Sequence, residues 1–238
     1  MKKAIIIGAS SGIGRELAKI FASNGYEVGI VARRTGLLDE LKAEMTVNTY
    51  TAAIDITNTD IVIRSLEYLI KEMSVVDIVV ISAGIGYINP ELDWSKDKET
   101  IDTNVSGFAA IAGTAMKYFA QKKSGHLVGI SSIAGIRGSN ECSAYNASKA
   151  FMSNYLEGLR KKSEKEKMDI TITDIQPGLV DTAMAKGEGL FWVAPPKKAA
   201  KQIYKAILKK KKKAYITKRW AIIAWVLKII PDFIYNKI

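Results

Sequence analysis

The stretch Ala4-Ile5-Ile6-Ile7-Gly8-Ala9-Ser10-Ser11-Gly12-Ile13-Gly14 carries a short apolar run directly into a glycine cluster. The next residues, Arg15–Ser23, place apolar side chains at helical spacing. Glycines in such a turn allow the backbone to approach a pyrophosphate, whose charge meets the N–H groups of the helix start. The pattern therefore predicts a dinucleotide-binding loop that uses Gly8, Ser10, Ser11, Gly12, Ile13 and Gly14. A turn that only joins a strand to a helix is the alternative.

Similar apolar runs recur along the chain, each too short for a helix and several rich in Val and Ile. We expect them to form strands buried on both faces of one sheet. The seven runs are Ala4–Ile7, Val28–Val31, Thr51–Ile54, Ile78–Ile81, Leu127–Ile130, Ile170–Ile175 and Ala214–Thr217.

Helical patterns separate these runs. Asn58 is a candidate cap for a helix through Lys71, and Asp97–Gln121 and Ser143–Lys165 have the pattern of longer helices. Alternating strands and helices predict an α/β fold with a doubly wound, mostly parallel sheet of the Rossmann type and helices on both faces. We expect one domain over residues 1–218, followed by an apolar and basic tail, 219–238, that is helical.

Charge is unevenly distributed in this chain of 238 residues, whose net charge is +11. Residues 197–238 hold 13 of the 35 Lys and Arg side chains and one acid, Asp232. Lys209 to Lys213 is an unbroken lysine run, and the tail adds aromatic and aliphatic residues. Peripheral membrane contact through anionic lipid and packing of the tail on protein are both open. Nucleic-acid binding is disfavoured because the rest of the chain is nearly neutral.

Few side chains are available for metal or thiol chemistry. The chain has one cysteine, Cys142, and one histidine, His126, which leaves no Cys/His metal site and no intramolecular disulfide. We expect His126 to lie in a loop before a strand. The single cysteine, with no secretory signal before Gly8, favours a cytoplasmic location.

The second apolar run ends at Arg33-Arg34, about 20 residues beyond the glycine loop. An acid near this point binds the ribose 2′-hydroxyl in NAD sites, whereas arginine receives the 2′-phosphate of NADP. No acid lies between Gly29 and Leu38, so the sequence favours NADP(H), with Arg33 ahead of Arg34.

Tyr145 and Lys149 stand four residues apart in Tyr-Asn-Ala-Ser-Lys at a predicted helix start, which places both on one face. An ammonium beside a phenol favours the phenolate, so this pair is suited to proton transfer. Ser132 lies thirteen residues earlier, in Gly-Ile-Ser-Ser-Ile-Ala-Gly. Ser131, the residue directly before it, is the alternative candidate.

With the glycine loop and Asn104 in Asn-Val-Ser-Gly, this set resembles the short-chain dehydrogenase/reductase family over residues 3–182. The resemblance implies that Tyr145 is the general acid/base and that Lys149 lowers its pKa and holds the nicotinamide ribose. It further implies that Ser132 hydrogen-bonds the substrate oxygen and that Asn104 holds a water linking Lys149 to bulk solvent. The further cofactor contacts that it implies are Asp55, Ile56, Ala83, Gly84, Pro177, Gly178, Val180 and Thr182.

Two residues depart from the family pattern: Ser82 replaces the usual asparagine before Ala83-Gly84, and Ile7 replaces a threonine. Neither affects the four catalytic positions. The sequence thus predicts an NADP(H)-dependent oxidoreductase that transfers hydride between nicotinamide and a carbonyl or alcohol of a largely apolar small molecule. A nucleotide-binding sensor or scaffold without turnover is the alternative. The family analogy favours a homodimer through the helices at 97–121 and 143–165, and Trp94, Phe191 and Trp192 are candidates for the substrate side.

Overall fold

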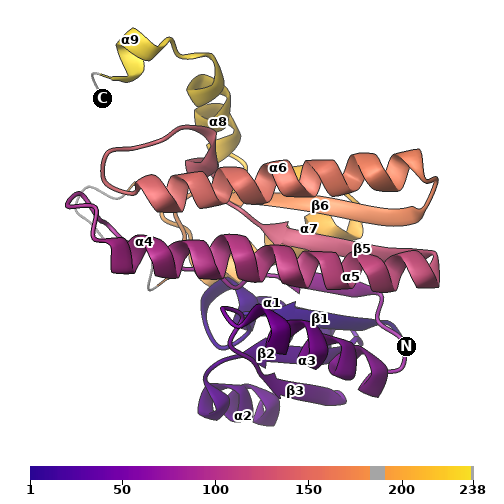
Figure 1. Cartoon of the computed structure of the whole chain (residues 1–238). Helices are drawn as coiled ribbons and strands as arrows, with labels where there is room; N and C mark the ends of the chain where they lie inside the picture. Colours follow the sequence, from indigo (N-terminus) through magenta and orange to yellow (C-terminus); the bar gives the residue numbers. More distant parts are fainter. Residues whose placement is uncertain (183–190, 237–238) are drawn as a thin grey trace.

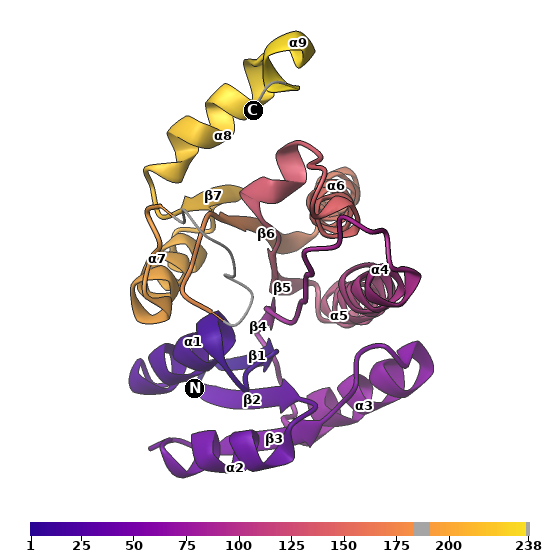
Figure 2. The ribbon, with the colours of Figure 1, turned by 90° about the vertical axis from the view of Figure 1, so that its left-hand side faces the viewer.

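The computed structural model describes residues 1–182 and 191–236. Seven parallel strands form one sheet in the order β3-β2-β1-β4-β5-β6-β7, which confirms the predicted α/β fold (Figures 1 and 2). The strands are β1 (Lys3–Ile7), β2 (Glu27–Ala32), β3 (Thr49–Ala53), β4 (Ile78–Ile81), β5 (Ser124–Ile130), β6 (Asp169–Pro177) and β7 (Lys213–Ile216).

Helices cover both faces of this sheet, so the chain crosses over between successive parallel strands (Figure 2). Their bounds are α1 (Gly12–Ser23), α2 (Thr35–Ala43), α3 (Thr59–Glu72), α4 (Trp94–Ile101), α5 (Phe108–Lys122), α6 (Ser143–Lys165), α7 (Pro196–Leu208), α8 (Trp220–Ile229) and α9 (Asp232–Tyr235). The expected cap at Asn58 is present, because its side chain accepts a hydrogen bond from the Ile61 amide at 3.2 Å.

Two apolar cores form, one on each face of the sheet. Side chains of α1, α2 and α7 fill one core, and side chains of α3, α5 and α6 fill the other. Strands β1 and β4 are buried almost throughout, as the apolar runs predict. Strand β3 differs: it lies at the sheet edge, and Thr51 and Ala53 are exposed. The prediction of burial on both faces is wrong for this strand, because the face that carries Thr51 and Ala53 is left uncovered.

The order of the strands reverses between β1 and β4, which lie side by side in the middle of the sheet. After β1 the chain turns into α1, and after β4 it leaves in the opposite direction across the sheet. Such a reversal opens a crevice at the carboxyl ends of the strands, where open α/β sheets bind ligands. The residues that follow Ile7 and Ile81 are therefore placed at the expected binding edge.

The helix predicted over 97–121 is interrupted. Helix α4 runs into a π-helical segment, Asp102–Gly107, before α5 continues along the same direction. A π-helical turn closes i→i+5 hydrogen bonds, and such turns are frequent at functional sites. Apolar spacing does not reveal this change of winding, which places Asn104 in the middle of the segment.

His126 also differs from the expectation, since it lies within β5 and is buried rather than in a loop. Its Nε2 is 2.8 Å from the Thr173 hydroxyl on β6. Burial, with a smaller contribution from the charge of Lys210, lowers the pKa of His126 to about 4. The imidazole is thus a neutral core side chain that bridges two strands.

The lysine run and the tail lie at opposite ends of β7. Lys209–Lys212 precede the strand at its amino end, where Lys210 pairs with Asp169 and Lys212 pairs with Glu164. Helix α8 begins beyond the carboxyl end of β7 and projects from the body (Figures 1 and 2). The run and the tail therefore do not form the single basic and apolar surface that their closeness in sequence suggests.

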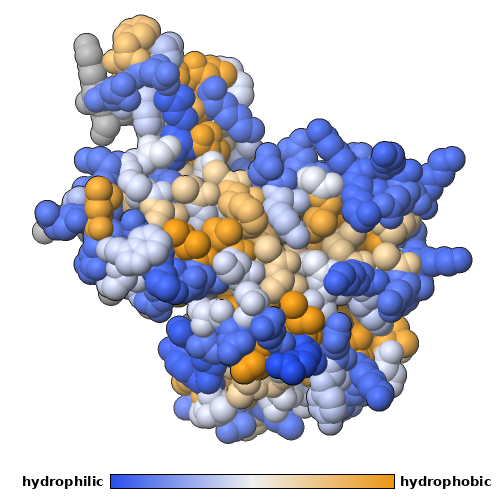
Figure 3. Space-filling view, in the orientation of Figure 1, coloured by the Kyte–Doolittle hydropathy of each residue, from blue (hydrophilic) through white to orange (hydrophobic). Residues whose placement is uncertain are grey.

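Helix α8 has an apolar outer face. Its exposed apolar side chains recur at i, i+3, i+4 and i+7: Ile222, Trp225, Val226 and Ile229. Apolar residues are visible on this projection in Figure 3. The opposite face is anchored by Trp220 and Ala224, which are buried. Among the residues that the structure describes, no helix has the length and apolar character needed to cross a bilayer.

Candidate active site

The glycine loop brings three strands into close contact. Gly8 has φ +88°, and its amide donates to the Val31 carbonyl of β2 at 2.8 Å. A Cβ on Gly8 would lie 2.5 Å from the Ala83 amide nitrogen, and a Cβ on Gly14 would lie 2.1 Å from the Gly8 carbonyl oxygen. Because no side chain fits at either position, the loop lies directly against the segment that follows β4.

The loop presents the start of α1 to the crevice. Ser11 is extended and precedes the helix, and the Ser10 and Ser11 hydroxyls accept hydrogen bonds from Arg34 Nη2 at 2.9 and 3.0 Å. The first-turn amides of a helix have no intrahelical acceptor, and the helix dipole favours negative charge there. Gly12 and Ile13 in this turn therefore offer donors that fit a pyrophosphate.

Arg33 lies beyond β2 on the open side of the crevice. Its Nη1 is 3.8 Å from Asp55 Oδ2, and both side chains are about half exposed. Burial opposes ionisation of Asp55, but hydrogen bonds from the Thr57 amide and hydroxyl and the charge of Arg33 hold its pKa below the usual value. Ile56, the next residue, packs its carbonyl against Gly107, where a Cβ would lie 2.4 Å from that oxygen.

Ser132, Tyr145 and Lys149 converge at the carboxyl end of β5. Ser132 follows this strand. Its hydroxyl donates to the Pro177 carbonyl at 3.3 Å and lies close enough to the Tyr145 phenol to lower its pKa. Lys149 Nζ donates to the Ile130 carbonyl at 3.2 Å and lies 5.6 Å from the centre of the Tyr145 ring. The helical spacing of Tyr145 and Lys149 thus places both beside the serine.

Burial dominates the electrostatics of this cluster. It raises the pKa of the Tyr145 phenol, and the hydrogen bond with Ser132 acts in the opposite direction. Burial also lowers the pKa of Lys149 to about 8, and the charge of Asp174 acts against this shift. Burial therefore favours the neutral form of both groups.

Asn104 links the π-helical segment to two neighbouring elements and is fully buried. Its Nδ2 donates to the Ile85 carbonyl at 2.7 Å and to the Ser148 hydroxyl at 3.0 Å, and its Oδ1 accepts from the Ile85 amide at 2.9 Å. Gly84 lies between this amide and the lysine, since a Cβ there would be 3.1 Å from Lys149 Nζ and 3.2 Å from Asn104 Oδ1.

The segment after β6 closes the other side of the crevice. Gly178 is covered by the indole of Trp220, which a Cβ on Gly178 would approach to 2.2 Å. Thr182 faces the glycine loop, because a Cβ on Gly12 would lie 3.1 Å from Thr182 Cγ2. Val180 forms an isolated parallel bridge with Ala194. Pro177, Gly178, Val180 and Thr182 therefore lie on the same edge of the sheet as the catalytic candidates.

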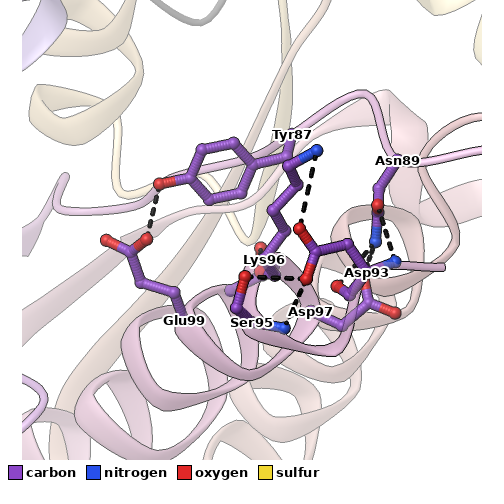
Figure 4. Close-up of polar contacts among 8 residues, drawn as sticks. Tyr87, Asn89, Asp93, Ser95, Lys96, Asp97 and Glu99 are labelled. Carbon is purple, nitrogen blue, oxygen red and sulfur yellow. Dashed lines mark hydrogen bonds and ion pairs between the residues drawn. The ribbon is translucent and has the colours of Figure 1, made fainter. Parts of the chain in front are cut away.

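The loop between Gly84 and α4 is braced by side-chain hydrogen bonds (Figure 4). Asn89 is buried and donates to the Asp97 carboxylate at 2.8 Å, and the Tyr87 hydroxyl donates to Glu99 at 2.6 Å. The same loop lies over the tyrosine: a Cβ on Gly86 would be 2.5 Å from the Tyr145 ring. This loop therefore forms an ordered wall over Tyr145.

Aromatic side chains gather on the side of Gly178. Phe191, Trp192 and Trp220 are in mutual contact, with ring centroids 5.1 to 5.9 Å apart, and Arg219 lies over Trp192. Trp94, the third residue that the sequence suggested for the substrate side, is largely exposed at the start of α4. Trp220 is a member of this cluster that the sequence analysis placed in the tail.

Sequence reasoning missed a buried polar network beneath the lysine. Asp174 on β6 accepts hydrogen bonds from the Ser131 hydroxyl and from Gln176 Nε2, and Gln176 also donates to Ser153 on α6. Ser131 therefore faces Asp174 rather than the tyrosine, which agrees with the choice of Ser132. The available signal lies on the face of β6 that carries Ile170 and Ile172. The next two residues on this face, Asp174 and Gln176, are polar.

The described ranges, 1–182 and 191–236, contain no group of three or more His, Cys, Asp or Glu side chains placed to hold a metal ion. Cys142 precedes α6 and is half-buried, and burial followed by the charge of Glu141 raises the pKa of its thiol.

Comparisons with known proteins agree with this geometry. A model of the short chain dehydrogenase family matches residues 2–190. An uncharacterized oxidoreductase of Myxococcus xanthus is 36% identical over 188 residues, which cover 77% of this chain and 74% of that protein.

Two solved structures share the fold. One is an alcohol dehydrogenase from Thermococcus sibiricus complexed with 5-hydroxy-NADP, with a TM-score of 0.78, 24% identity and coverage of 91% of this chain and 96% of that one. The other is a bulky-bulky ketone specific alcohol dehydrogenase from Comamonas testosteroni, with a TM-score of 0.80, 22% identity and coverage of 98% and 96%. The family binds a nicotinamide cofactor and acts on small molecules. The chain belongs to the short-chain dehydrogenase/reductase family of oxidoreductases.

Proposed function

We propose that the protein is an NADP(H)-dependent oxidoreductase that transfers hydride between nicotinamide and a carbonyl or alcohol of a largely apolar substrate. The observation that carries the proposal is the convergence of Ser132, Tyr145 and Lys149 at the carboxyl end of β5. Lys149 Nζ lies 5.6 Å from the centre of the Tyr145 ring, and the Ser132 hydroxyl lies close enough to the phenol to lower its pKa. These three side chains supply a proton, a second hydroxyl for the same oxygen and a cation.

The residues of the crevice fit a dinucleotide. The glycine loop, free of side chains at Gly8 and Gly14, and the first turn of α1 would hold the pyrophosphate. Arg33 would bind the 2′-phosphate, with Arg34 at the loop, and Asp55 and Ile56 would contact the adenine. Ala83, Gly84, Pro177, Gly178, Val180 and Thr182 would hold the nicotinamide half. When bound, the cofactor supplies or accepts the hydride.

The protein's part in carbonyl reduction is to stabilise and protonate the developing alkoxide. The Ser132 and Tyr145 hydroxyls would both hydrogen-bond the substrate oxygen, and Tyr145 would then give its proton to that oxygen. The Lys149 ammonium would stabilise the phenolate that remains. Asn104 would hold the segment at Ile85 close to the lysine and bind the water through which Lys149 meets solvent.

An apolar substrate suits the surroundings of this cluster. Phe191 and Trp192 lie against Trp220 on the side of Gly178, and the ordered loop at Gly86 covers the tyrosine ring. Aromatic faces remove apolar surface from water, whereas a charged substrate would have to lose its hydration there.

The competing function is a nucleotide-binding sensor of the same fold without significant turnover. A panel of aldehydes and ketones with NADPH, followed by nicotinamide absorbance, separates the two. We expect carbonyl-dependent oxidation of NADPH in the wild type and its loss in Tyr145→Phe. The sensor would be established instead if the protein bound NADPH but neither reduced any carbonyl with NADPH nor oxidised any alcohol with NADP.

Contacts with larger partners are also proposals. We propose a homodimer through α4–α5 and α6, which sedimentation equilibrium tests directly. We also propose a cytoplasmic location, because the chain has a single cysteine. For peripheral membrane contact, the outer face of α8 is the candidate. Co-sedimentation with anionic vesicles should then fall in Trp225→Ser, a substitution that leaves Trp220 on Gly178. Equal sedimentation of the two proteins would contradict this contact.

A further inference from the structure

A carboxylate lies in the core directly behind the catalytic candidates. Asp174 is 1% exposed, and its position on β6 points it toward α6, because Ile172 and Gln176 on the same face pack against that helix. The Ser131 hydroxyl and Gln176 Nε2 donate to its two oxygens. Both oxygens therefore have a hydrogen-bond partner in the core.

The cations on the elements around Asp174 are engaged elsewhere. Arg160 on α6 donates to the carbonyls of Ile172 and Lys212, and Lys212 itself pairs with Glu164. Lys210 pairs with Asp169, and Lys213 at the start of β7 is exposed. Within the described part of the chain, the buried cation beside Asp174 is Lys149 on α6. Its Nζ donates to the Ile130 carbonyl at 3.2 Å, and the next residue, Ser131, is hydrogen-bonded to Asp174.

The other carboxylates on the elements packed against Lys149 have partners of their own in the described ranges: Asp102 of the π-helical segment pairs with Lys98, and Asp169 of β6 pairs with Lys210. From β5 Lys149 meets the Ile130 carbonyl, from the loop after β4 it meets Gly84, and from the π-helical segment it meets Asn104. The remaining titratable neighbour is Tyr145 on its own helix. An ammonium that is 3% exposed needs a compensating charge, since burial strongly disfavours an isolated ion.

We propose that Asp174 is a positioning residue for the reaction: its buried negative charge keeps Lys149 in the ammonium form that Tyr145 requires. This inference rests on the proposed function, which assigns the proton transfer to Tyr145. Asp174 touches neither substrate nor cofactor and acts only through the lysine. Ser131 and Gln176 fix the carboxylate in place, so the network from Ser131 to Ser153 serves to hold one charge.

The first test reads Lys149 directly and needs no turnover. In protein labelled with 13C at the lysine ε-carbons, one lysine should titrate near pH 8, far below the surface lysines, and this resonance should vanish in Lys149→Met. In Asp174→Asn we expect its midpoint to fall by about 1 pH unit, because the attraction of a nearby opposite charge is lost.

The Asp174→Asn variant is expected to fold. Gln176 Oε1 has no hydrogen-bond partner among the described residues, so a turn of the Gln176 amide offers an acceptor to the side-chain NH₂ group that this substitution introduces. Should the variant not fold, Asp174→Ala removes the same charge without adding a donor. A Lys149 midpoint unchanged from wild type in the folded variant would overturn the inference.

Two matched controls separate charge from structure. Ser153→Ala removes one hydrogen bond of the network and keeps its charge, so the Lys149 midpoint should not move. Asp77→Asn removes a partly buried carboxylate that binds Lys122 and the Lys3 amide at the other end of the sheet. It should lower the melting temperature and leave the Lys149 midpoint in place. A fall in either control equal to that of Asp174→Asn would also overturn the inference.

The second test reads activity. Carbonyl reduction requires Tyr145 as the phenol and Lys149 as the ammonium. Activity is therefore lost when either member of the pair releases a proton as the pH rises. Loss of the Asp174 charge makes that proton easier to lose, and the alkaline limb of kcat/KM should move to lower pH. If Asp174→Asn turned over normally and its alkaline limb of kcat/KM did not move, the role of Asp174 would be contradicted and the proposed function would stand. Absence of turnover in the wild type would overturn the proposed function, and the lysine titration would still decide the inference.

Discussion

The two ends of the candidate crevice handle charge in opposite ways. At the catalytic end, Lys149, Asn104 and Asp174 are almost completely buried, and each polar group has a named partner in the core. At the open end, Arg33 and Asp55 are about half exposed and lie 3.8 Å apart. Solvent screens the charges of Arg33 and Asp55, whereas the buried groups at the catalytic end are not screened.

This difference separates two kinds of control. A buried charge or hydroxyl can decide whether a reaction proceeds, because the surroundings offer no substitute for it. An exposed arginine can be replaced in part by water and ions, so its influence is limited to which cofactor is preferred. Substitutions at the two ends should therefore differ in size and in the parameter that they change.

The largest effect is expected for Tyr145→Phe. The substitution keeps the ring against Gly86 and removes the transferable proton, so kcat should fall by about 10²–10⁴-fold. NADPH binding, measured by fluorescence titration, should change little. A folded variant with near wild-type kcat would remove the tyrosine from the mechanism and end the contrast between the two regions.

Asn104→Ala should affect both activity and stability. It leaves the Ile85 amide and carbonyl without the partners that Asn104 provides in a buried place, which costs about 1–3 kcal/mol. We expect a lower free energy of unfolding in urea titrations together with a lower kcat. Thr114→Ala on α5 is a suitable control, since its hydroxyl donates to a carbonyl of its own helix and lies outside the site.

Arg33→Ala should change the cofactor preference by about tenfold or more, because a charge-assisted hydrogen bond to a phosphate contributes about 1.5–3 kcal/mol. Arg33 can turn toward the phosphate at little cost, since its contact with Asp55 is long. Arg34 is already hydrogen-bonded to Ser10 and Ser11, so Arg34→Ala should weaken NADPH and NADH alike.

The measurement for both arginines is kcat/KM with each cofactor. A wild type that prefers NADH would contradict the assignment of NADP(H). If Arg34→Ala instead carried the larger change in preference, the 2′-phosphate would belong to Arg34, and Arg33 would serve only its pair with Asp55.

The smallest effect is expected for that pair itself. A double-mutant cycle of Arg33→Ala and Asp55→Asn, read by thermal unfolding without cofactor, should give a coupling below about 1 kcal/mol, as is usual for exposed ion pairs. The coupling should decrease further with added salt. A coupling of several kcal/mol would show that the open end is not screened and would weaken the comparison.

Much of the fold could be predicted from the sequence because its signals are local. Strand β4 and helix α6 have the predicted bounds, and the spacing between Tyr145 and Lys149 is a direct consequence of helical geometry. The glycine loop could be recognised because close contacts between residues of the loop itself exclude side chains and so require glycine. Gly14 illustrates this, since a Cβ there would lie 2.1 Å from the carbonyl oxygen of Gly8 in the same loop.

The features that were missed depend on contacts between distant segments. The packing of Trp220 on Gly178 joins residues 42 positions apart, and no periodicity in the tail indicates it. The position of His126 within β5 depends on where the strand begins, which its glycine and serine neighbours obscure. The separation of the lysine run from the tail follows from the direction of β7, a property of the sheet and not of composition.

The π-helical segment Asp102–Gly107 has a consequence for the history of this chain. An i→i+5 turn encloses one residue more than an α-helical turn, so the segment is equivalent to a single-residue insertion in an otherwise continuous helix. A relative without that residue would rotate the side chains before the insertion by about 100° against those after it. Asn104 could not then face Ile85 while α5 kept its packing. Sequence comparisons across the family should therefore keep insertions and deletions out of residues 102–107 wherever the asparagine is present.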